Sequence, residues 1–244
     1  MARYIESDMA HPTTNPKTDM PVTPWPAPPD APVLLFGGSF DPPHTAHTRL
    51  ASAARDALFG TNGWLVYVPA SQNPHKPTGP CVSDAHRVAM LRLAIGDDKR
   101  SAVWTDEIDR MPAGSCTACP SYWVDTLERA RRVIGQDTPL RFLIGADQAI
   151  AFDRWHEHDK IISLAEPAVV LRDPLSNRES FRRLLIESGL DPAHWMPRII
   201  TTDLHPAVST DIRASIGCGR TPTDMLDPAV AAYIAEHGLY CHQD

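Results

Sequence analysis

VLLFGGSFDPPHTAH, residues 33–47, joins a short apolar run to a glycine-rich turn and then to a pair of histidines. The apolar run at 33–36 is bounded by Pro32 and Gly37. A continuous apolar run of this length is typical of a strand that is buried on both faces, as in parallel sheets. The run therefore predicts a strand of a parallel sheet, and the turn follows the carboxyl end of that strand.

The same pattern recurs along the chain and alternates with helical periodicity. Apolar runs at 64–68, 140–144 and 168–171 predict further strands, and a weaker run lies at 198–201. Helical patterns span roughly 46–59, 83–96, 121–134, 154–164, 177–188, 209–216 and 227–237. Strands that alternate with helices predict an α/β fold with a doubly wound parallel sheet. Ligands of such sheets bind outside the carboxyl ends of the strands, where the strand order switches.

Length and composition fit one α/β domain with an N-terminal extension. The chain has 244 residues, of which 43% are hydrophobic and 22% charged, which is a globular balance. Eight prolines precede Val33, so we expect a disordered or surface-draped extension at 1–31 and a single domain at 32–244. The net charge of −7 argues against a nucleic-acid partner, and no apolar run is long enough to suggest a membrane span.

The cysteines predict a reduced, cytoplasmic protein. An odd and scattered set is typical of free thiols, and the N-terminus lacks the apolar core of a secretory signal. The single CxxC, Cys116 and Cys119, lacks the second ligand pair that a structural zinc site needs. We therefore expect no metal held by the protein itself.

The turn after the first predicted strand has the composition of a phosphate site. Gly37 and Gly38 let backbone N–H groups approach a phosphate, and two prolines stiffen the turn. His44 and His47 are three residues apart at the start of a helix, so they point to one side, where the helix end favours an anion. A zinc site is the alternative for such a pair, but no third ligand has an obvious spacing.

The turn resembles the GG(T/S)FDPxHxGH signature of the nucleotidyltransferase superfamily, with Ala46 at a position where the family usually has glycine. The resemblance implies a Rossmann-like nucleotidyltransferase domain in which His44 and His47 contact the phosphates of ATP. It also implies ATP contacts along the turn itself, at Gly37, Gly38, Ser39 and Phe40.

A second motif, STDIR at 209–213, lies about 170 residues further along the chain. Ser209 or Thr210 can cap a helix, and Arg213 follows one turn later, a combination that suits a triphosphate. The motif resembles the family's ISSTxIR segment, which binds the phosphates of ATP. Alone it is more typical of an ordinary capped surface helix, but the two motifs in this order favour the ATP site.

Further segments resemble nicotinate-nucleotide adenylyltransferases: NPHK at 73–76, SYWVDTL at 121–127, with Trp123 where the family usually has threonine, IGAD at 144–147, and Trp155. The resemblance implies that Asp147 bonds hydroxyls of ribose or adenosine and that Trp155 stacks on the nicotinate ring. The implied contacts of nicotinate mononucleotide are Asp41, Asn73, Lys76, Tyr122, Trp123, Thr126 and Trp155. The alternatives are a solvated Lys76, a helix-capping Asp147 and a Trp155 that packs in the core.

The implied reaction transfers AMP from ATP to nicotinate mononucleotide and releases pyrophosphate. The attacking phosphate is already ionised at pH 7, so catalysis reduces to positioning and electrostatic stabilisation. The resemblance assigns His47 and His44 to the α- and β-phosphates, and Lys76, Ser209, Thr210 and Arg213 to the leaving pyrophosphate. Mg²⁺ is expected on the phosphates of ATP, with mostly water ligands.

Three other functions compete with this interpretation. A sibling enzyme would use nicotinamide mononucleotide or pantetheine phosphate as the acceptor. A nucleotide-binding regulatory protein without turnover is supported only by Ala46 and Trp123. A fragment related to class I aminoacyl-tRNA synthetases would share the histidine turn, but no Lys-Met-Ser-Lys-Ser-like loop and no basic surface accompany it. Assembly into a homo-oligomer stays open, because no helix face suggests an assembly surface.

Overall fold

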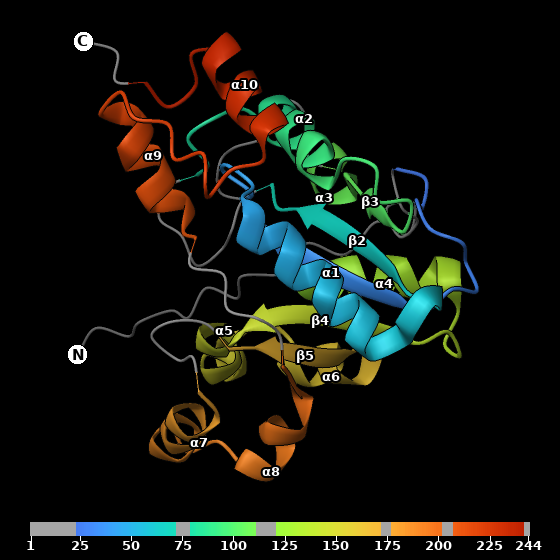
Figure 1. Cartoon of the computed structure of the whole chain (residues 1–244). Helices are drawn as coiled ribbons and strands as arrows, with labels where there is room; N and C mark the ends of the chain where they lie inside the picture. The colour runs from blue at the N-terminus through green and yellow to red at the C-terminus, as the bar shows by residue number, and fades with distance from the viewer. Residues whose placement is uncertain (1–22, 72–78, 111–120, 172–176, 202–206, 242–244) are drawn as a thin grey trace, which may run out of the picture.

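The sheet of this computed structural model has the predicted doubly wound topology. The structure describes residues 23–71, 79–110, 121–171, 177–201 and 207–241. Within these ranges, six parallel strands lie in the order β3-β2-β1-β4-β5-β6 (Figure 1). The strands are β1 Val33–Gly38, β2 Trp64–Pro69, β3 Ser101–Val103, β4 Leu140–Gly145, β5 Glu166–Val170 and β6 Ile199–Ile200. The strand order switches between β1 and β4, where this topology places ligands.

Helices cover both faces of the sheet (Figure 1). They are α1 Thr45–Phe59, α2 Asp84–Ile95, α3 Asp106–Asp109, α4 Trp123–Ile134, α5 Ala146–Ile150, α6 His158–Leu164, α7 Arg178–Glu187, α8 Pro192–Trp195, α9 Ser209–Gly217 and α10 Pro228–Glu236. No helix within the described ranges is long and apolar enough to cross a membrane.

The alternation of side chains along each strand divides the core between the two faces. Val33 and Leu35 of β1 point into a cluster built with α4 and α6, whereas Leu34 points into a second cluster built with α1. All three side chains are fully buried. The continuous apolar run of β1 is therefore explained as predicted, because both faces of the strand are covered.

A third apolar cluster attaches the end of the chain to this body. Met90 of α2 packs with Ile212 of α9 and with Val230 and Ile234 of α10, and all four side chains are buried. In Figure 1 these three helices lie together at one end of the molecule. The cluster holds α9 next to the carboxyl edge of the sheet, where the turn after β1 also lies.

One expected helix begins later than predicted, and part of the expected extension is placed by the structure. The helix expected at 154–164 begins only at His158, because Phe152–Arg154 form a 3-10 turn and Glu157 has a left-handed backbone with φ of 52°. His156 therefore does not lie on a helix face. Of the expected extension, residues 23–31 lie against the domain: Trp25 packs against the α4-side cluster, and Ala27 is buried in it.

Candidate active site

The predicted phosphate residues of the turn and of α9 meet at the carboxyl edge of the sheet, although their motifs lie far apart in the sequence. Ser209 donates a hydrogen bond from Oγ to the carbonyl oxygen of Pro42 at 3.0 Å. Arg213 donates from Nη1 to the carbonyl oxygen of Asp41 at 2.6 Å. We call this group, made of His44, His47, Ser209, Thr210 and Arg213, the α1–α9 junction.

The two histidines of the junction face the same side, as predicted. His44 is the N-cap residue of α1 and is buried, and His47 lies in the first turn of the helix. Their rings stack with centroids 3.6 Å apart, and the backbone N–H of His44 donates to Nδ1 of His47 at 3.3 Å. Two imidazoles are thus held at the amino end of a 15-residue helix, where the helix dipole favours an anion.

The prediction that Ser209 or Thr210 caps α9 is wrong. The N-cap residue is Val208, and no side chain caps this helix. Ser209 is already the first helical residue, so its hydroxyl bonds to Pro42 instead. Thr210 accepts a longer hydrogen bond, of 3.4 Å, from Nη2 of Arg213. The first turn of α9 therefore presents its backbone N–H groups beside Arg213, an arrangement suited to an anion.

The glycines at the end of β1 leave room for aromatic rings of the protein. A Cβ on Gly37 would lie 2.8 Å from Cζ3 of Trp123, and a Cβ on Gly38 would lie 3.0 Å from Cζ of Phe40. Phe40 has a left-handed backbone, with φ of 48°, and its ring is buried between Phe36 and Tyr67. Of Phe40, therefore, only the backbone is placed to contact a nucleotide.

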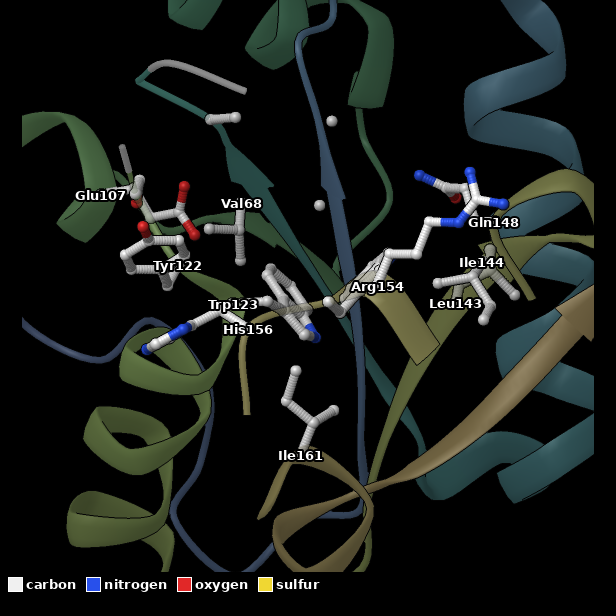
Figure 2. A pocket seen from close by; sticks show the side chains of 15 residues that line it. Val68, Glu107, Tyr122, Trp123, Leu143, Ile144, Gln148, Arg154, His156 and Ile161 are labelled. Atoms are coloured by element: carbon white, nitrogen blue, oxygen red, sulfur yellow. The ribbon is translucent and has the colours of Figure 1, made fainter. Parts of the chain in front are cut away.

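Next to Gly37 and Gly38 lies a cavity of about 360 Å³. Its walls come from the ends of β1, β2 and β4, from the segments that begin α3 and α4, and from the segment after α5. The lining residues are Gly37, Gly38, Val68, Ala70, Glu107, Ser121, Tyr122, Trp123, Leu143, Ile144, Gln148, Arg154, Trp155, His156 and Ile161. Figure 2 shows Glu107 and Tyr122 on one side of this pocket and Gln148 and Arg154 on the other.

Three predicted aromatic residues line the pocket: Tyr122, Trp123 and Trp155. Trp155 packs against Phe152, with ring centroids 5.2 Å apart, and remains partly exposed to the cavity. It thus combines core packing with partial exposure at the cavity, so the two interpretations of Trp155 are compatible. The ring of Tyr122 lies 4.2 Å from the imidazole of His156. Flat rings of this kind suit a heteroaromatic ligand.

Behind Tyr122 lies a buried polar network that supports the pocket wall. The hydroxyl of Thr126 donates to Oε1 of Glu107 at 2.6 Å, and Arg110 donates to Ser121 at 2.7 Å and to Thr126 at 3.2 Å. Burial raises the pKa of Glu107, although the charge of Arg110 and the hydrogen bonds of Thr126 and Ser121 act in the opposite direction. Thr126, predicted to bind the mononucleotide, is fully buried and has its hydroxyl engaged in this network.

A buried arginine connects the turn after β1 to the end of β2. Arg87 of α2 is inaccessible to solvent. Its guanidinium donates to the carbonyl oxygens of Ser39 at 2.6 Å and of Ala70 at 2.7 Å, and it pairs with Asp84 at 2.5 Å. Because both carbonyls follow strands at the carboxyl edge, Arg87 fixes the spacing of two loops that border the site.

The remaining predicted residues are placed in different ways. Asp147 is exposed in the first turn of α5, and Asp41 is bonded within the protein. Asn73 and Lys76 lie outside the described residues, as do Cys116 and Cys119. Among the residues that the structure describes, no group of three His, Cys, Asp or Glu side chains could hold a metal ion.

The sequence interpretation missed three groups of the site: Glu107, Arg87 and Arg154. Arg87 is a charged residue within the helix expected at 83–96, where a solvated face is the usual expectation, and Glu107 lies outside every expected element. Nothing in the local sequence marks either residue as buried. The one available signal was their position: Glu107 precedes the SYWVDTL segment, and Arg154 directly precedes Trp155.

Comparison with known proteins agrees with this geometry. The model of the family described as cytidylyltransferase-like matches residues 35–215, which include both motifs of the α1–α9 junction. Among solved structures, nicotinic acid mononucleotide adenylyltransferase of Plasmodium falciparum, complexed with NaAD, has a TM-score of 0.60 at 16% identity over 86% of this chain and 97% of that one. At that identity the likeness establishes the fold alone.

Relatives of higher identity cover most of the chain. A probable nicotinate-nucleotide adenylyltransferase of Stenotrophomonas maltophilia is 36% identical over 85% of this chain and 96% of its own length. One of Chromobacterium violaceum is 36% identical over 86% of this chain and 99% of its own length. The chain therefore belongs to the cytidylyltransferase-like family and, within it, to the nicotinate-nucleotide adenylyltransferases.

Proposed function

We propose that the protein transfers AMP from ATP to nicotinate mononucleotide, giving nicotinate adenine dinucleotide, the precursor of NAD, and pyrophosphate. The observation that carries the proposal is the meeting of the two predicted phosphate motifs beside an aromatic pocket. Arg213 and Ser209 reach the backbone of Asp41 and Pro42 directly, next to the stacked histidines. The pocket and the α1–α9 junction both adjoin the turn after β1, so two substrates can meet there.

The pocket suits the mononucleotide. Its volume, about 360 Å³, lies within the range of small-molecule sites. Tyr122, Trp123 and Trp155 offer ring surfaces to the pyridine, and Arg154 and His156 add groups that can meet negative charge. In this proposal the pyridine ring lies against Trp155, and the 5′-phosphate points toward the turn after β1.

The α1–α9 junction suits the triphosphate of ATP. Two helices direct their amino ends and the side chains of His44, His47 and Arg213 toward one region. These groups are donors that the fold holds in place before the reaction begins. The 5′-phosphate attacks the α-phosphorus, the bond to the β-phosphate oxygen breaks, and the charge that develops on pyrophosphate is met by these donors. No residue has to remove a proton from the ionised nucleophile.

We further propose that Mg²⁺ arrives with ATP. This ion prefers to keep several water ligands and to bind the phosphates of its nucleotide. When bound, the ion would neutralise part of the negative charge of the phosphates. The protein residues proposed for the phosphates are then His44, His47 and Arg213, with Lys76 as a further proposed contact.

Nicotinamide mononucleotide is the second candidate substrate, and one observation bears on the choice. Glu107 lines the pocket, and an ionised carboxylate there would repel the carboxylate of nicotinate and accept a hydrogen bond from an amide. Burial raises the pKa of Glu107 and so acts against its ionised form, and Arg154 and His156 in the same pocket can meet the negative charge of a carboxylate. This supports the acid as the preferred substrate.

The test is release of pyrophosphate from ATP and Mg²⁺, measured in parallel with nicotinate mononucleotide, nicotinamide mononucleotide and pantetheine phosphate. We expect kcat/KM to be highest for the nicotinate substrate. A preference for the amide or for pantetheine phosphate would mean that the enzyme uses the same mechanism with a different acceptor. Binding of ATP without turnover of any acceptor would instead identify a regulatory nucleotide-binding protein.

A further inference from the structure

Asp41 connects the turn after β1 to two distant parts of the chain. Its side chain is 5% exposed. Oδ1 accepts a hydrogen bond from the hydroxyl of Tyr240 at 2.7 Å, and Oδ2 accepts one from the backbone N–H of Cys81 at 2.6 Å. The carbonyl oxygen of the same residue accepts from Arg213 at 2.6 Å. All three oxygens of Asp41 are therefore bonded within the protein.

The segment that carries Tyr240 is held firmly where it leaves α10. Gly238 turns the chain with φ of 59°, and the backbone N–H of Leu239 donates to the carbonyl of Ile234 at 3.0 Å. Leu239 is buried in the apolar cluster of α2, α9 and α10. Tyr240 itself has a left-handed backbone, with φ of 64°, a conformation that costs energy for a residue other than glycine. Such a conformation persists only where surrounding contacts enforce it.

We propose that Tyr240 is a positioning residue for the transfer reaction, because its hydroxyl fixes Asp41 and thereby the turn that carries His44. The proposal rests on the proposed function of the α1–α9 junction. Only Pro42 and Pro43 separate Asp41 from His44, and their fixed φ angles transmit the position of Asp41 to the histidine. The same residue supplies the carbonyl that holds Arg213. One hydrogen bond from the last described turn therefore aligns both halves of the junction.

Tyr240→Phe removes the hydroxyl and keeps the ring. Without it, Oδ1 of Asp41 loses its donor in a buried site, and the turn is free to shift. Because misplacement of catalytic groups acts on the transition state, we expect kcat to fall about 10- to 100-fold while KM for the mononucleotide changes by less than about twofold. Tyr122 and Trp155, the pocket residues proposed to hold the mononucleotide, do not belong to this contact.

Tyr233→Phe is the matched control, since it removes a hydroxyl from the same end of the molecule. Tyr233 of α10 bonds to Nδ1 of His86 at 3.0 Å rather than to the turn. We expect this variant to keep the wild-type kcat. If both variants lose the same activity, or if Tyr240→Phe keeps the wild-type kcat, the proposal is overturned.

Hydrogen–deuterium exchange of the peptide that covers residues 38–50 tests the contact without turnover. We expect faster exchange in this peptide in Tyr240→Phe, and wild-type exchange in Tyr233→Phe. A wild-type protein that turns over no acceptor would refute the proposed function, yet faster exchange would still establish that Tyr240 fixes the turn. Unchanged exchange in Tyr240→Phe would overturn the positioning role, whatever the wild-type activity.

Discussion

At the end of β1, the indole ring of Trp123 occupies the space that a side chain on Gly37 would need. A Cβ on Gly37 would lie 2.8 Å from the indole carbon Cζ3, closer than two carbon atoms pack without strain. We predict that Gly37→Ala lowers the free energy of unfolding by about 1–3 kcal/mol, the usual cost of overpacking, as measured by urea denaturation.

Gly79→Ala is the control for this prediction, because a Cβ there meets no atom within 4 Å. Trp123→Leu should relieve the clash, so the double variant Gly37→Ala with Trp123→Leu should lose less stability than the sum of the two single changes. Strict additivity would show that the glycine is not required by the indole ring.

His47 tests the phosphate role directly. Its ring is stacked on that of His44 at the amino end of α1, where it can donate to a phosphate oxygen. We predict that His47→Ala lowers kcat about 10²-fold, the scale of one lost preorganised donor. His237→Ala, an exposed histidine next to the end of α10, should leave kcat unchanged. Near-normal turnover of His47→Ala would remove this histidine from the mechanism.

Glu107 makes stability depend on pH. Its pKa is raised in the folded protein, mainly by burial, so between the unfolded and the folded pKa the folded state binds more protons than the unfolded state. Stability from this group is therefore complete below the unfolded pKa, near pH 4.5, and is lost as the pH rises through the folded pKa. Each unit of pKa shift is equivalent to about 1.4 kcal/mol.

Glu107→Gln keeps the side chain's shape and cannot ionise. We predict that the melting temperature of this variant, relative to that of the wild type, increases between pH 4.5 and pH 8. Subtracting the melting temperatures of the two proteins cancels the effect of the other carboxyl groups. These include Asp125, whose pKa is also raised by burial, and Asp98, whose pKa is lowered because its hydrogen bonds to Arg55 and Ser101 outweigh its partial burial. A difference that is constant with pH would contradict the raised pKa.

Among the elements, α10 depends on a capping residue that the sequence makes visible. Asp227 accepts a hydrogen bond from the backbone N–H of Ala229 at 2.8 Å, and Pro228 occupies the first helical position. We predict that Asp227→Ala lowers the free energy of unfolding by about 1 kcal/mol in urea denaturation, whereas Asp227→Ser retains most of the stability. Equal losses in both variants would show that capping is not the cause.

The sequence predicted those elements in which the local pattern of apolar residues matches the faces that are buried in the fold. The apolar run at 33–36 predicted a buried strand, because a strand covered on both faces has apolar residues at successive positions. The structure confirms this strand and the parallel sheet to which it belongs. β3 was missed because its three residues are only partly buried and form no apolar run. The helices α3, α5 and α8 have four or five residues each, too few for a periodicity to emerge.

In the candidate site, too, the sequence predicted residues of continuous motifs and missed residues that only the fold brings together. The residues of the two phosphate motifs were found because each motif is continuous in sequence, and the structure brings them together. Glu107 reaches the pocket only through the packing of α3 against Thr126, and Arg87 only through the carbonyls of two separate loops. Contacts of this kind join residues far apart in the chain, so no local sequence pattern predicts them. The substrate contacts themselves stay predictions.

At the scale of the whole molecule, the segment before β1 packs against α3, the helix that contributes Glu107 to the pocket wall. Trp104 is fully buried, and its indole N–H donates to the carbonyl of Thr23 at 3.2 Å. The ring of Trp25 lies edge-on to it, with centroids 4.9 Å apart. Thr23 also donates to the carboxylate of Asp109 in α3, the helix that carries Glu107. Residues 23–31 therefore stabilise the wall of the pocket as well as the core.

A pair of shortened chains isolates this contribution, one beginning at residue 23 and one at residue 32. Because neither carries residues 1–22, their difference measures residues 23–31 alone. We predict that the shorter chain is less stable by about 2–4 kcal/mol in urea denaturation, since it exposes the ring of Trp104 and leaves its buried N–H without an acceptor. Its tryptophan fluorescence should also shift to longer wavelength.

The kinetic consequence follows from where the segment packs. It contacts Trp104 after β3 and Asp109 of α3, the helix that contributes Glu107 to the pocket, and none of its described contacts reaches the α1–α9 junction. We therefore expect the shorter chain, assayed well below its melting temperature, to have a raised KM for nicotinate mononucleotide and an unchanged KM for ATP. An equal rise in both constants would mean that the whole sheet loosens when the segment is lost. A rise for ATP alone would contradict the division of the site into a pocket and a junction.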